Sequence, residues 1–401
     1  MDKNTNNWKE FTLGNTQEEQ PRRVQDRRRV SKKRVLWFLL SVTLVVAAAA
    51  VVLLWDQSSF DGLRRSVIYA RAQKDESGCA VLYQYDTDTT GIFAVLEGRL
   101  ISVSQSRLRM QNEKGETVLS EGVRFTDPAV TDNGKCAAVY DVGGKELYVL
   151  SDKGVLWHRE TDGEILSVTL NAKNQVAVTA NRSGYKAAVC VYDAGGEPLY
   201  EFDSSQRFCM TAAVSDDGRY LGAVTLGQAE GGFSSYLVLY RMDREEPVAT
   251  CQLPGSMVYD LQWSNGLFCA VSDSALYFVK PDGELAAQYD FGGDYLRRCV
   301  MGSGYGAVLL SHYRSGSQCT LLLVDTQGQL LGSAEMEGEV LSLSAAGRYI
   351  GVLYSDRLVI YNKYAQQEAA LSGISEARQV MMRPDGSAVL AGVNAARLYL
   401  P

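Results

Sequence analysis

The sequence predicts an all-β fold, a β-propeller of eight four-stranded blades, preceded by one transmembrane helix. Turns that contain glycine or asparagine recur eight times between Gly98 and Gly386, at about 41 residues per step, which is the length of one four-stranded blade. Short strands rich in Val, Ala and Tyr follow these turns. A charge-free run of 21 residues lies ahead of the repeats.

Residues 1–34 are the first predicted segment, a disordered basic tail on the cytoplasmic side. They carry ten Lys or Arg and five Asp or Glu, whereas residues 56–401 carry 30 basic and 42 acidic side chains. Phosphate binding needs a basic face, which this acidic outer region lacks. We therefore expect no nucleic-acid partner.

Residues 35–55 are predicted to form the transmembrane helix. At 1.5 Å per residue this segment would be about 31 Å long, which matches a hydrocarbon core of about 30 Å. Because the basic tail precedes it, the positive-inside rule places the N-terminus in the cytoplasm and the C-terminal domain outside the cell membrane. A cleaved signal peptide is the alternative, but the apolar run continues past the small residues Ala47 to Ala50.

Residues 56–78 are predicted to be a juxtamembrane stalk with a short amphipathic helix. Phe60, Leu63, Val67 and Ile68 share one helical face, and Ser59 can cap its start. This face could lie on the bilayer or beneath the propeller, and the sequence leaves both open.

Residues 79–401 are predicted to form the extracytoplasmic propeller. Each unit contains a second turn, such as Asp282-Gly283, in which Asp bonds its own backbone and Gly accepts a positive φ. Strands such as residues 236–240 and 320–324 are nearly continuous apolar runs, which indicates burial on both faces. Stacked blades require such burial.

The two ends of this region predict how the ring closes. The last unit stops at Pro401, where other units finish their third strand, so its fourth strand is missing. Residues 79–85 form a spare strand, and we expect it to pair with residues 395–400 and remove an exposed edge. This closure gives eight blades, or seven if one unit is irregular.

Few residues have the types and spacing of a catalytic or metal-binding site. His158 and His312 are far apart in sequence and have no second ligand at metal spacing, so we expect structural or surface roles and predict no catalytic, cofactor-binding or metal-binding residue. Disulfides are possible for the eight cysteines, but most lie in strand-like runs, which favours free, buried thiols. These cysteines are Cys79, Cys136, Cys190, Cys209, Cys251, Cys269, Cys299 and Cys319.

One segment matches the spacing of a calcium-binding loop. Asp86, Asp88, Gly91 and Glu97 have the spacing of such a loop, but the flanking residues read as strands where that loop requires helices. We therefore expect a plain acidic connection.

Residues 191–200 and similar units resemble quinoprotein-like and WD40-like propeller repeats. Over residues 35–401 the chain resembles an uncharacterised clostridial family of single-pass, membrane-anchored propeller proteins. Quinoprotein dehydrogenases carry a pair of neighbouring cysteines that this chain lacks, so the resemblance implies no cofactor. Cofactor-free propellers, similar to the lipoprotein scaffold of outer-membrane assembly, are the nearer analogy, at the level of fold.

We expect a non-enzymatic binding or scaffold module, a monomeric propeller, for an envelope protein or cell-wall polymer. Loops at one end of the ring would provide the surface, and the long insertion at residues 226–234 is the first place to look. The alternatives are an envelope enzyme, either a quinone-dependent oxidoreductase or a glycan hydrolase using central carboxylates, and the ectodomain of a signalling receptor.

Overall fold

The computed structural model describes residues 37–43, 45, 46, 61, 65, 79–85, 91–229, 232–253 and 255–401. It divides into two units, residues 1–60 and 61–401.

In the first unit, residues 37–43, 45 and 46 are helical. No helix in the described part of the chain has the length and apolar character needed to cross a membrane. The basic tail and the other residues of the predicted transmembrane helix lie outside the described residues.

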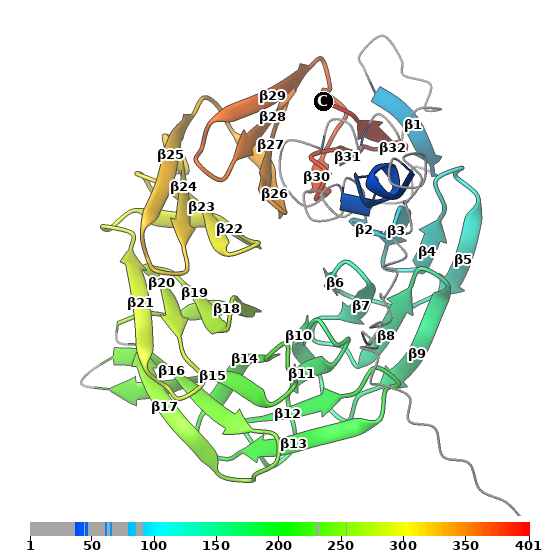
Figure 1. Ribbon diagram of the computed structural model, residues 1–401. Helices are drawn as coiled ribbons and strands as arrows, with labels where there is room; N and C mark the ends of the chain where they lie inside the picture. The colour runs from blue at the N-terminus through cyan, green and yellow to red at the C-terminus, as the bar shows by residue number, and fades with distance from the viewer. Residues whose placement is uncertain are drawn as a thin grey trace, which may run out of the picture. The chain divides into compact units, whose positions relative to one another are not determined.

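The second unit is a ring of eight antiparallel sheets, each with four strands (Figure 1). We number the blades by chain order, so that blade 1 is β2–β5 and blade 8 is β30–β32 with β1. The inner strands are β2 (Ile92–Leu96), β6 (Pro128–Asp132), β10 (Ile165–Leu170), β14 (Phe208–Val214), β18 (Val258–Ser264), β22 (Tyr295–Gly302), β26 (Val340–Ala346) and β30 (Gln379–Met382). The second strands are β3 (Arg99–Val103), β7 (Cys136–Asp141), β11 (Val176–Ala180), β15 (Tyr220–Ala229), β19 (Leu267–Ser272), β23 (Tyr305–Ser311), β27 (Tyr349–Tyr354) and β31 (Ala388–Ala391).

The outer half of each blade completes the sheet. The third strands are β4 (Arg107–Gln111), β8 (Glu146–Ser151), β12 (Ala187–Tyr192), β16 (Gly232–Arg241), β20 (Ala275–Val279), β24 (Cys319–Asp325), β28 (Arg357–Asn362) and β32 (Ala395–Tyr399). The outer strands are β5 (Thr117–Gly122), β9 (Gly154–Glu160), β13 (Pro198–Ser204), β17 (Pro247–Leu253), β21 (Leu285–Asp290), β25 (Leu330–Met336), β29 (Gln367–Ser372) and β1 (Cys79–Gln84).

Burial follows the position of a strand in its blade. Every residue of β11, β20 and β23 is buried, because a neighbouring blade covers each face of these strands. The outer strand β13 has exposed residues at alternate positions along most of its length. The predicted burial on both faces is therefore confirmed for these three strands, whereas residues 236–240 and 320–324, from which it was predicted, are each buried at three positions and half-buried at two.

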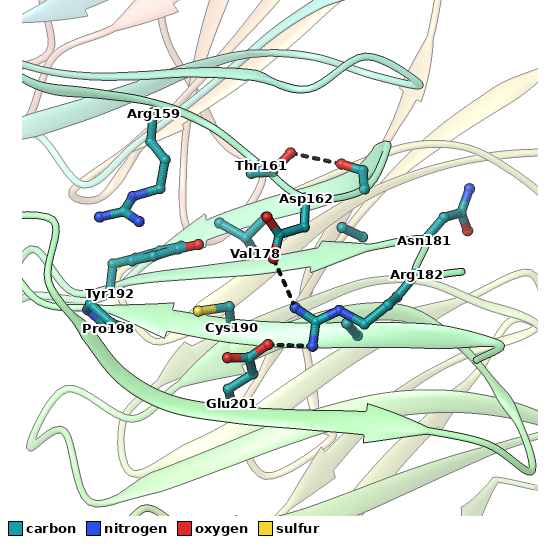
Figure 2. A pocket seen from close by; sticks show the side chains of 13 residues that line it. Arg159, Thr161, Asp162, Val178, Asn181, Arg182, Cys190, Tyr192, Pro198 and Glu201 are labelled. Atoms are coloured by element: carbon teal, nitrogen blue, oxygen red, sulfur yellow. Dashed lines mark hydrogen bonds and ion pairs between the residues drawn. The ribbon is translucent and has the colours of Figure 1, made fainter. Parts of the chain in front are cut away.

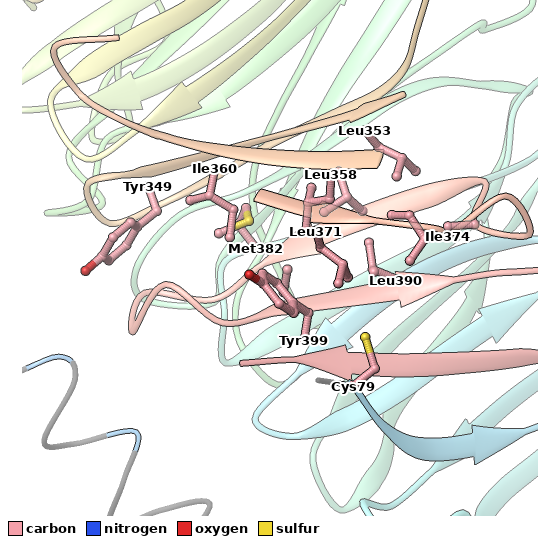
Figure 3. Packing of buried hydrophobic residues seen from close by; sticks show 13 residues of the cluster. Cys79, Tyr349, Leu353, Leu358, Ile360, Leu371, Ile374, Met382, Leu390 and Tyr399 are labelled. Atoms are coloured by element: carbon pink, nitrogen blue, oxygen red, sulfur yellow. The ribbon is translucent and has the colours of Figure 1, made fainter. Parts of the chain in front are cut away.

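The ring closes as the sequence predicts. β1 pairs with β32 in antiparallel register, with Cys79 opposite Tyr399 and Gln84 opposite Ala395. Cys79 and Tyr399 belong to a buried cluster that joins blade 8 to blade 7 (Figure 3). On the other side, the hydroxyl of Tyr83 donates to the backbone oxygen of Gly98 in blade 1, at 2.6 Å. The prediction of eight blades is confirmed.

The predicted glycine turns join the inner strand to the second strand of each blade. We call the end of the ring that carries these turns the turn end. The loop end is the opposite end, which carries the connections from second to third strands and from one blade to the next. Successive strands of a blade run in opposite directions, so the two sets of connections lie at opposite ends.

The second turns of blades 3 and 5 pack closely on the preceding blade. Gly283 in blade 5 has φ +90°, and a Cβ there would lie 2.5 Å from the Cβ of Ala249 in the outer strand of blade 4. A Cβ on Gly196 in blade 3 would likewise overlap the side chain of Trp157 in blade 2. Glycine therefore serves both the turn conformation and the close approach of neighbouring blades.

Candidate functional site

A pocket of about 430 Å³ lies between blades 5 and 6. It opens at the loop end, because its residues come from the starts of the inner strands β18 and β22 and from the loop after β19. We call it the blade 5–6 pocket, and its lining residues are Tyr259, Asp260, Val271, Asp273, Tyr295, Leu296, Arg297, Arg298 and Cys299. This volume is within the range of small-ligand pockets.

β-Bulges aim two of these side chains. The register of β18 shifts between Val258 and Asp260, so Tyr259 is the extra residue, and a matching shift makes Arg297 the extra residue of β22. Blades 3, 4 and 7 carry the same shift near the start of their inner strands. Bulges re-aim side chains and recur next to binding sites. The same bulge thus recurs in five blades, and its extra residue differs between blades 5 and 6.

The two tyrosines of the pocket are exposed, and one of them, Tyr295, lies beside an arginine. Tyr259 is 56% exposed and Tyr295 is 39% exposed. The guanidinium of Arg314 lies 5.6 Å from the ring centre of Tyr295, and Arg298 donates to the backbone oxygen of Leu341 in blade 7 at 2.7 Å. Tyrosine and arginine are enriched among the side chains that carry binding energy at interfaces.

Asp260 connects this pocket to a larger one. Tyr259 and Asp260 also line a central pocket of about 620 Å³, whose other walls come mainly from the inner strands of blades 2 to 5. Asp260 accepts a 2.7 Å hydrogen bond from Gln262 and makes no ion pair with the described residues. Partial desolvation raises the pKa of Asp260, a half-buried residue, and, in the same pocket, of Asp132, although residue 132 as a whole is exposed. No Lys or Arg is among the described residues that line the central pocket.

Asp260 is expected to reduce stability at neutral pH. The pKa of this carboxyl is higher in the folded chain than in the unfolded chain, where it is about 3.9. Its contribution to the free energy of unfolding is therefore fully present below about pH 3.9 and is lost as pH rises through the folded-state pKa. We therefore expect Asp260→Asn to raise Tm by a few degrees at neutral pH and to leave it nearly unchanged in acid. Thermal melts across pH measure this, with Glu121→Gln on β5 as an exposed-carboxylate control. An equal shift at every pH would contradict the assignment.

The loop end of blades 3–6 also collects exposed aromatic rings. Of the seven strongly exposed aromatic side chains described in the propeller, six lie at this end and one, Tyr364, at the turn end. The six are Tyr185, Phe208, Phe233, Tyr259, Tyr295 and Tyr313. Phe233 lies in the predicted insertion, which forms a long hairpin of β15 and β16. The insertion is thus part of this surface, although it does not line the blade 5–6 pocket.

A third pocket, between blades 2 and 3, is held together by ion pairs (Figure 2). Arg182 pairs with Asp162 at 3.2 Å, with Asp203 at 2.8 Å and with Glu201. Three carboxylates surround one guanidinium, and the volume is only about 140 Å³. Burial raises the pKa of the nearby Cys190, so that thiol stays protonated and unreactive. We assign this pocket a structural role.

The histidines singled out from the sequence lie on different blades. His158 on β9 pairs with Glu146 and stacks on Tyr148, with ring centres 4.1 Å apart. His312, in the loop after β23, lies 3.0 Å from Asp294. The predicted structural and surface roles fit these contacts.

All eight cysteines are free thiols, as expected, six of them buried and two half-buried. Burial raises the pKa of Cys299 in the blade 5–6 pocket and raises that of Cys269 beside it to about 12. Neither is therefore a thiolate nucleophile at neutral pH. Residues 86–90 of the calcium-like segment lie outside the described residues, but its flanks are strands, as predicted.

Sequence reasoning missed the residues of the blade 5–6 pocket. The available signal was strand length, because the inner strands of blades 3–7 have six to eight residues whereas those of blades 1, 2 and 8 have four or five. A longer inner strand indicates the bulge. The other side chains of the pocket come from the next blade, about 40 positions away in sequence, so strand length does not identify them.

Solved structures show the same architecture at low identity. The C-terminal WD40 domain of Sif2 has a TM-score of 0.57 at 12% identity, covering 80% of this chain and 99% of that chain. BamB from Moraxella catarrhalis has a TM-score of 0.51 at 13% identity, covering 80% and 98%. Apo AztD from Citrobacter koseri has a TM-score of 0.51 at 12% identity, covering 75% and 90%. These likenesses show the fold alone.

No curated protein matches the chain in sequence. One family model does match, over residues 73–389, which is most of the chain and nearly all of the propeller. The chain therefore belongs to the family described as "Family of unknown function (DUF5711)".

Proposed function

We propose that this protein is a single-pass membrane protein whose extracytoplasmic propeller binds an envelope protein or a cell-wall polymer and catalyses no reaction. The anchor rests on the 21-residue apolar run after a basic tail. The helical residues Trp37, Phe38, Leu39, Leu40, Val42, Val45 and Val46 are all strongly exposed in the structure. Such side chains favour a lipid environment.

One observation carries the binding role, namely the exposed aromatic surface at the loop end beside the blade 5–6 pocket. Large exposed aromatic side chains next to arginine are costly in a surface without a partner and typical of interface centres. The blades beneath them are rigid, since their middle strands are fully buried. Rigid scaffolds with variable loops are suited to recognition.

The proposal predicts which tyrosines matter. The double change Tyr259→Ala and Tyr295→Ala is expected to weaken binding of the envelope ligand by about 2 kcal/mol, roughly thirty-fold, because both rings flank the same pocket. The matched control is Tyr364→Ala, which removes an exposed ring at the turn end.

The measurement compares these variants with the unaltered full chain. Binding to isolated cell-wall polymer is assayed by co-sedimentation, and binding to envelope proteins by crosslinking and affinity capture. Loss of one ligand in the double variant alone supports the proposal. Equal binding by all three proteins would refute the assignment of this surface.

A glycan hydrolase is the second candidate, because inward carboxylates with raised pKa are present. Asp132 and Asp260 line the same central pocket. A hydrolase needs a raised-pKa acid together with a second carboxylate across the scissile bond. Here burial raises each pKa, and neither carboxylate is a cause of the other's shift. Release of sugar fragments by the wild type and not by Asp260→Asn would favour this candidate over pure binding.

A further inference from the structure

Two residues of the predicted stalk contact the turn end of the propeller. Asp61 and Arg65 are both helical residues and lie four positions apart in the sequence. Asp61 is only 8% exposed, accepts a 2.7 Å hydrogen bond from the hydroxyl of Tyr349, and lies 3.4 Å from Nε of Arg348. Arg65 donates to the backbone oxygen of Asp385 at 2.7 Å.

We call these five residues the clasp, and it engages two blades. Arg348 and Tyr349 follow the glycine turn of blade 7, and Asp385 precedes the glycine of the turn in blade 8. The hydroxyl of Tyr349 accepts a 2.6 Å hydrogen bond from Arg348, which also pairs with Glu368 at 3.4 Å. The Asp61 carboxylate thus enters a connected polar network at the turn end.

The turn of blade 8 is shaped to receive Arg65. Gly386 has φ +83°, and a Cβ on it would lie 2.7 Å from Nη1 of Arg65 and 2.9 Å from the ring of Tyr349. Any larger residue would displace the arginine. If Asp61 lost its contacts with Tyr349 and Arg348, its buried carboxylate would be an uncompensated charge. This cost favours the bound arrangement of the clasp.

Chain length limits how far the clasp can be from the membrane. The predicted transmembrane segment ends at Trp55, six residues before Asp61. Six residues span at most about 22 Å even when fully extended. If residues 35–55 are the anchor, the turn end beside blades 7 and 8 must therefore lie close to the bilayer surface.

We propose that the clasp holds the propeller with its turn end toward the membrane, so that the loop end faces away from it. This inference rests on the proposed membrane anchor and deepens it, because it selects the face that meets the ligand. The blade 5–6 pocket and the exposed aromatic surface then face the envelope side.

The test measures which end of the ring lies near lipid headgroups. A dye is placed through a click-reactive amino acid at Ser303 or at Ser315, which are exposed at the turn end and the loop end of the same blade. The full-length chain is reconstituted in phosphatidylglycerol–phosphatidylethanolamine vesicles that carry a headgroup nitroxide, a short-range quencher. Flotation with the vesicles is measured in parallel.

We expect flotation and several-fold stronger quenching at Ser303 than at Ser315. Asp61→Ala should abolish this difference and leave flotation unchanged, whereas Asp56→Ala, a nearby acidic change, should preserve both. Circular dichroism confirms that each variant is folded, and Arg65→Ala provides a second, milder change to the clasp.

The outcomes separate the two proposals. Flotation with equal quenching at both sites would overturn the orientation and leave the anchor standing. A persistent difference in both the Asp61→Ala and the Arg65→Ala variants would overturn the role of the clasp. Failure to float would overturn the anchor, and the orientation with it.

Discussion

A chain that begins at residue 86 is expected to be unfolded or aggregated, whereas one that begins at residue 79 is expected to fold. The two differ by β1, which supplies the fourth strand of blade 8. Without it, β32 becomes an open edge, and the buried side chains of Cys79, Tyr83 and Tyr85 leave the clusters on both sides of the blade. Each such loss costs about 2–5 kcal/mol, so three of them approach the whole stability of a domain.

Size-exclusion chromatography and thermal unfolding measure this difference. Substitutions at Tyr83 provide a graded version in the full-length chain. Tyr83→Phe removes the hydrogen bond to Gly98 and is expected to cost about 1–3 kcal/mol, while Tyr83→Ala also empties a buried site and should cost about 3–5 kcal/mol. Equal Tm values for the two truncated chains would show that closure by β1 does not stabilise the ring.

Gly283→Ala is expected to destabilise the propeller more than Gly266→Ala. Both glycines have a positive φ, +90° and +81°, so alanine at either position strains the backbone and lowers the free energy of unfolding by about 1–2 kcal/mol. At Gly283 the new Cβ would also lie 2.5 Å from the Cβ of Ala249, while nothing lies within 4 Å at Gly266. The overlap should add about 1–3 kcal/mol.

Chemical denaturation of the two variants isolates the contact between blades from the strain of the turn. The double change Gly283→Ala with Ala249→Gly should recover most of the extra loss, because it removes the opposing Cβ. If Gly283→Ala and Gly266→Ala are equally stable, the close approach of blades 4 and 5 contributes nothing measurable. In that case, the positive φ of the turn alone would explain why glycine occupies position 283.

Period and turn chemistry allowed most of the fold to be predicted. Turns such as Asp385-Gly386 are local, because glycine meets its φ requirement within a few residues and the strands beside it are short. The missing fourth strand at Pro401 and the spare strand at Cys79 then leave one way to complete the last sheet. Blade number, strand order and closure followed from these local signals.

The candidate site could not be predicted in the same way. Tyr259 and Tyr295 are ordinary strand residues in sequence, and the insertion at residues 226–234 looked like the better candidate. A bulge aims Tyr259, and its neighbours in the pocket come from the following blade. The raised pKa of Asp260 depends on burial, which exists only after the ring has formed. The clasp joins residues 288 and 320 positions apart, a separation to which no sequence period applies.

The sequence by itself therefore determined the repeat, the eight blades and the strand that closes them, because these depend on hydrogen bonds and turn conformations set within a few residues. Tertiary structure alone decided which side chains share a pocket, which carboxyl is desolvated, and where the stalk residues Asp61 and Arg65 bind. These properties depend on the stacking of blades, which brings side chains together across distances that no local pattern records.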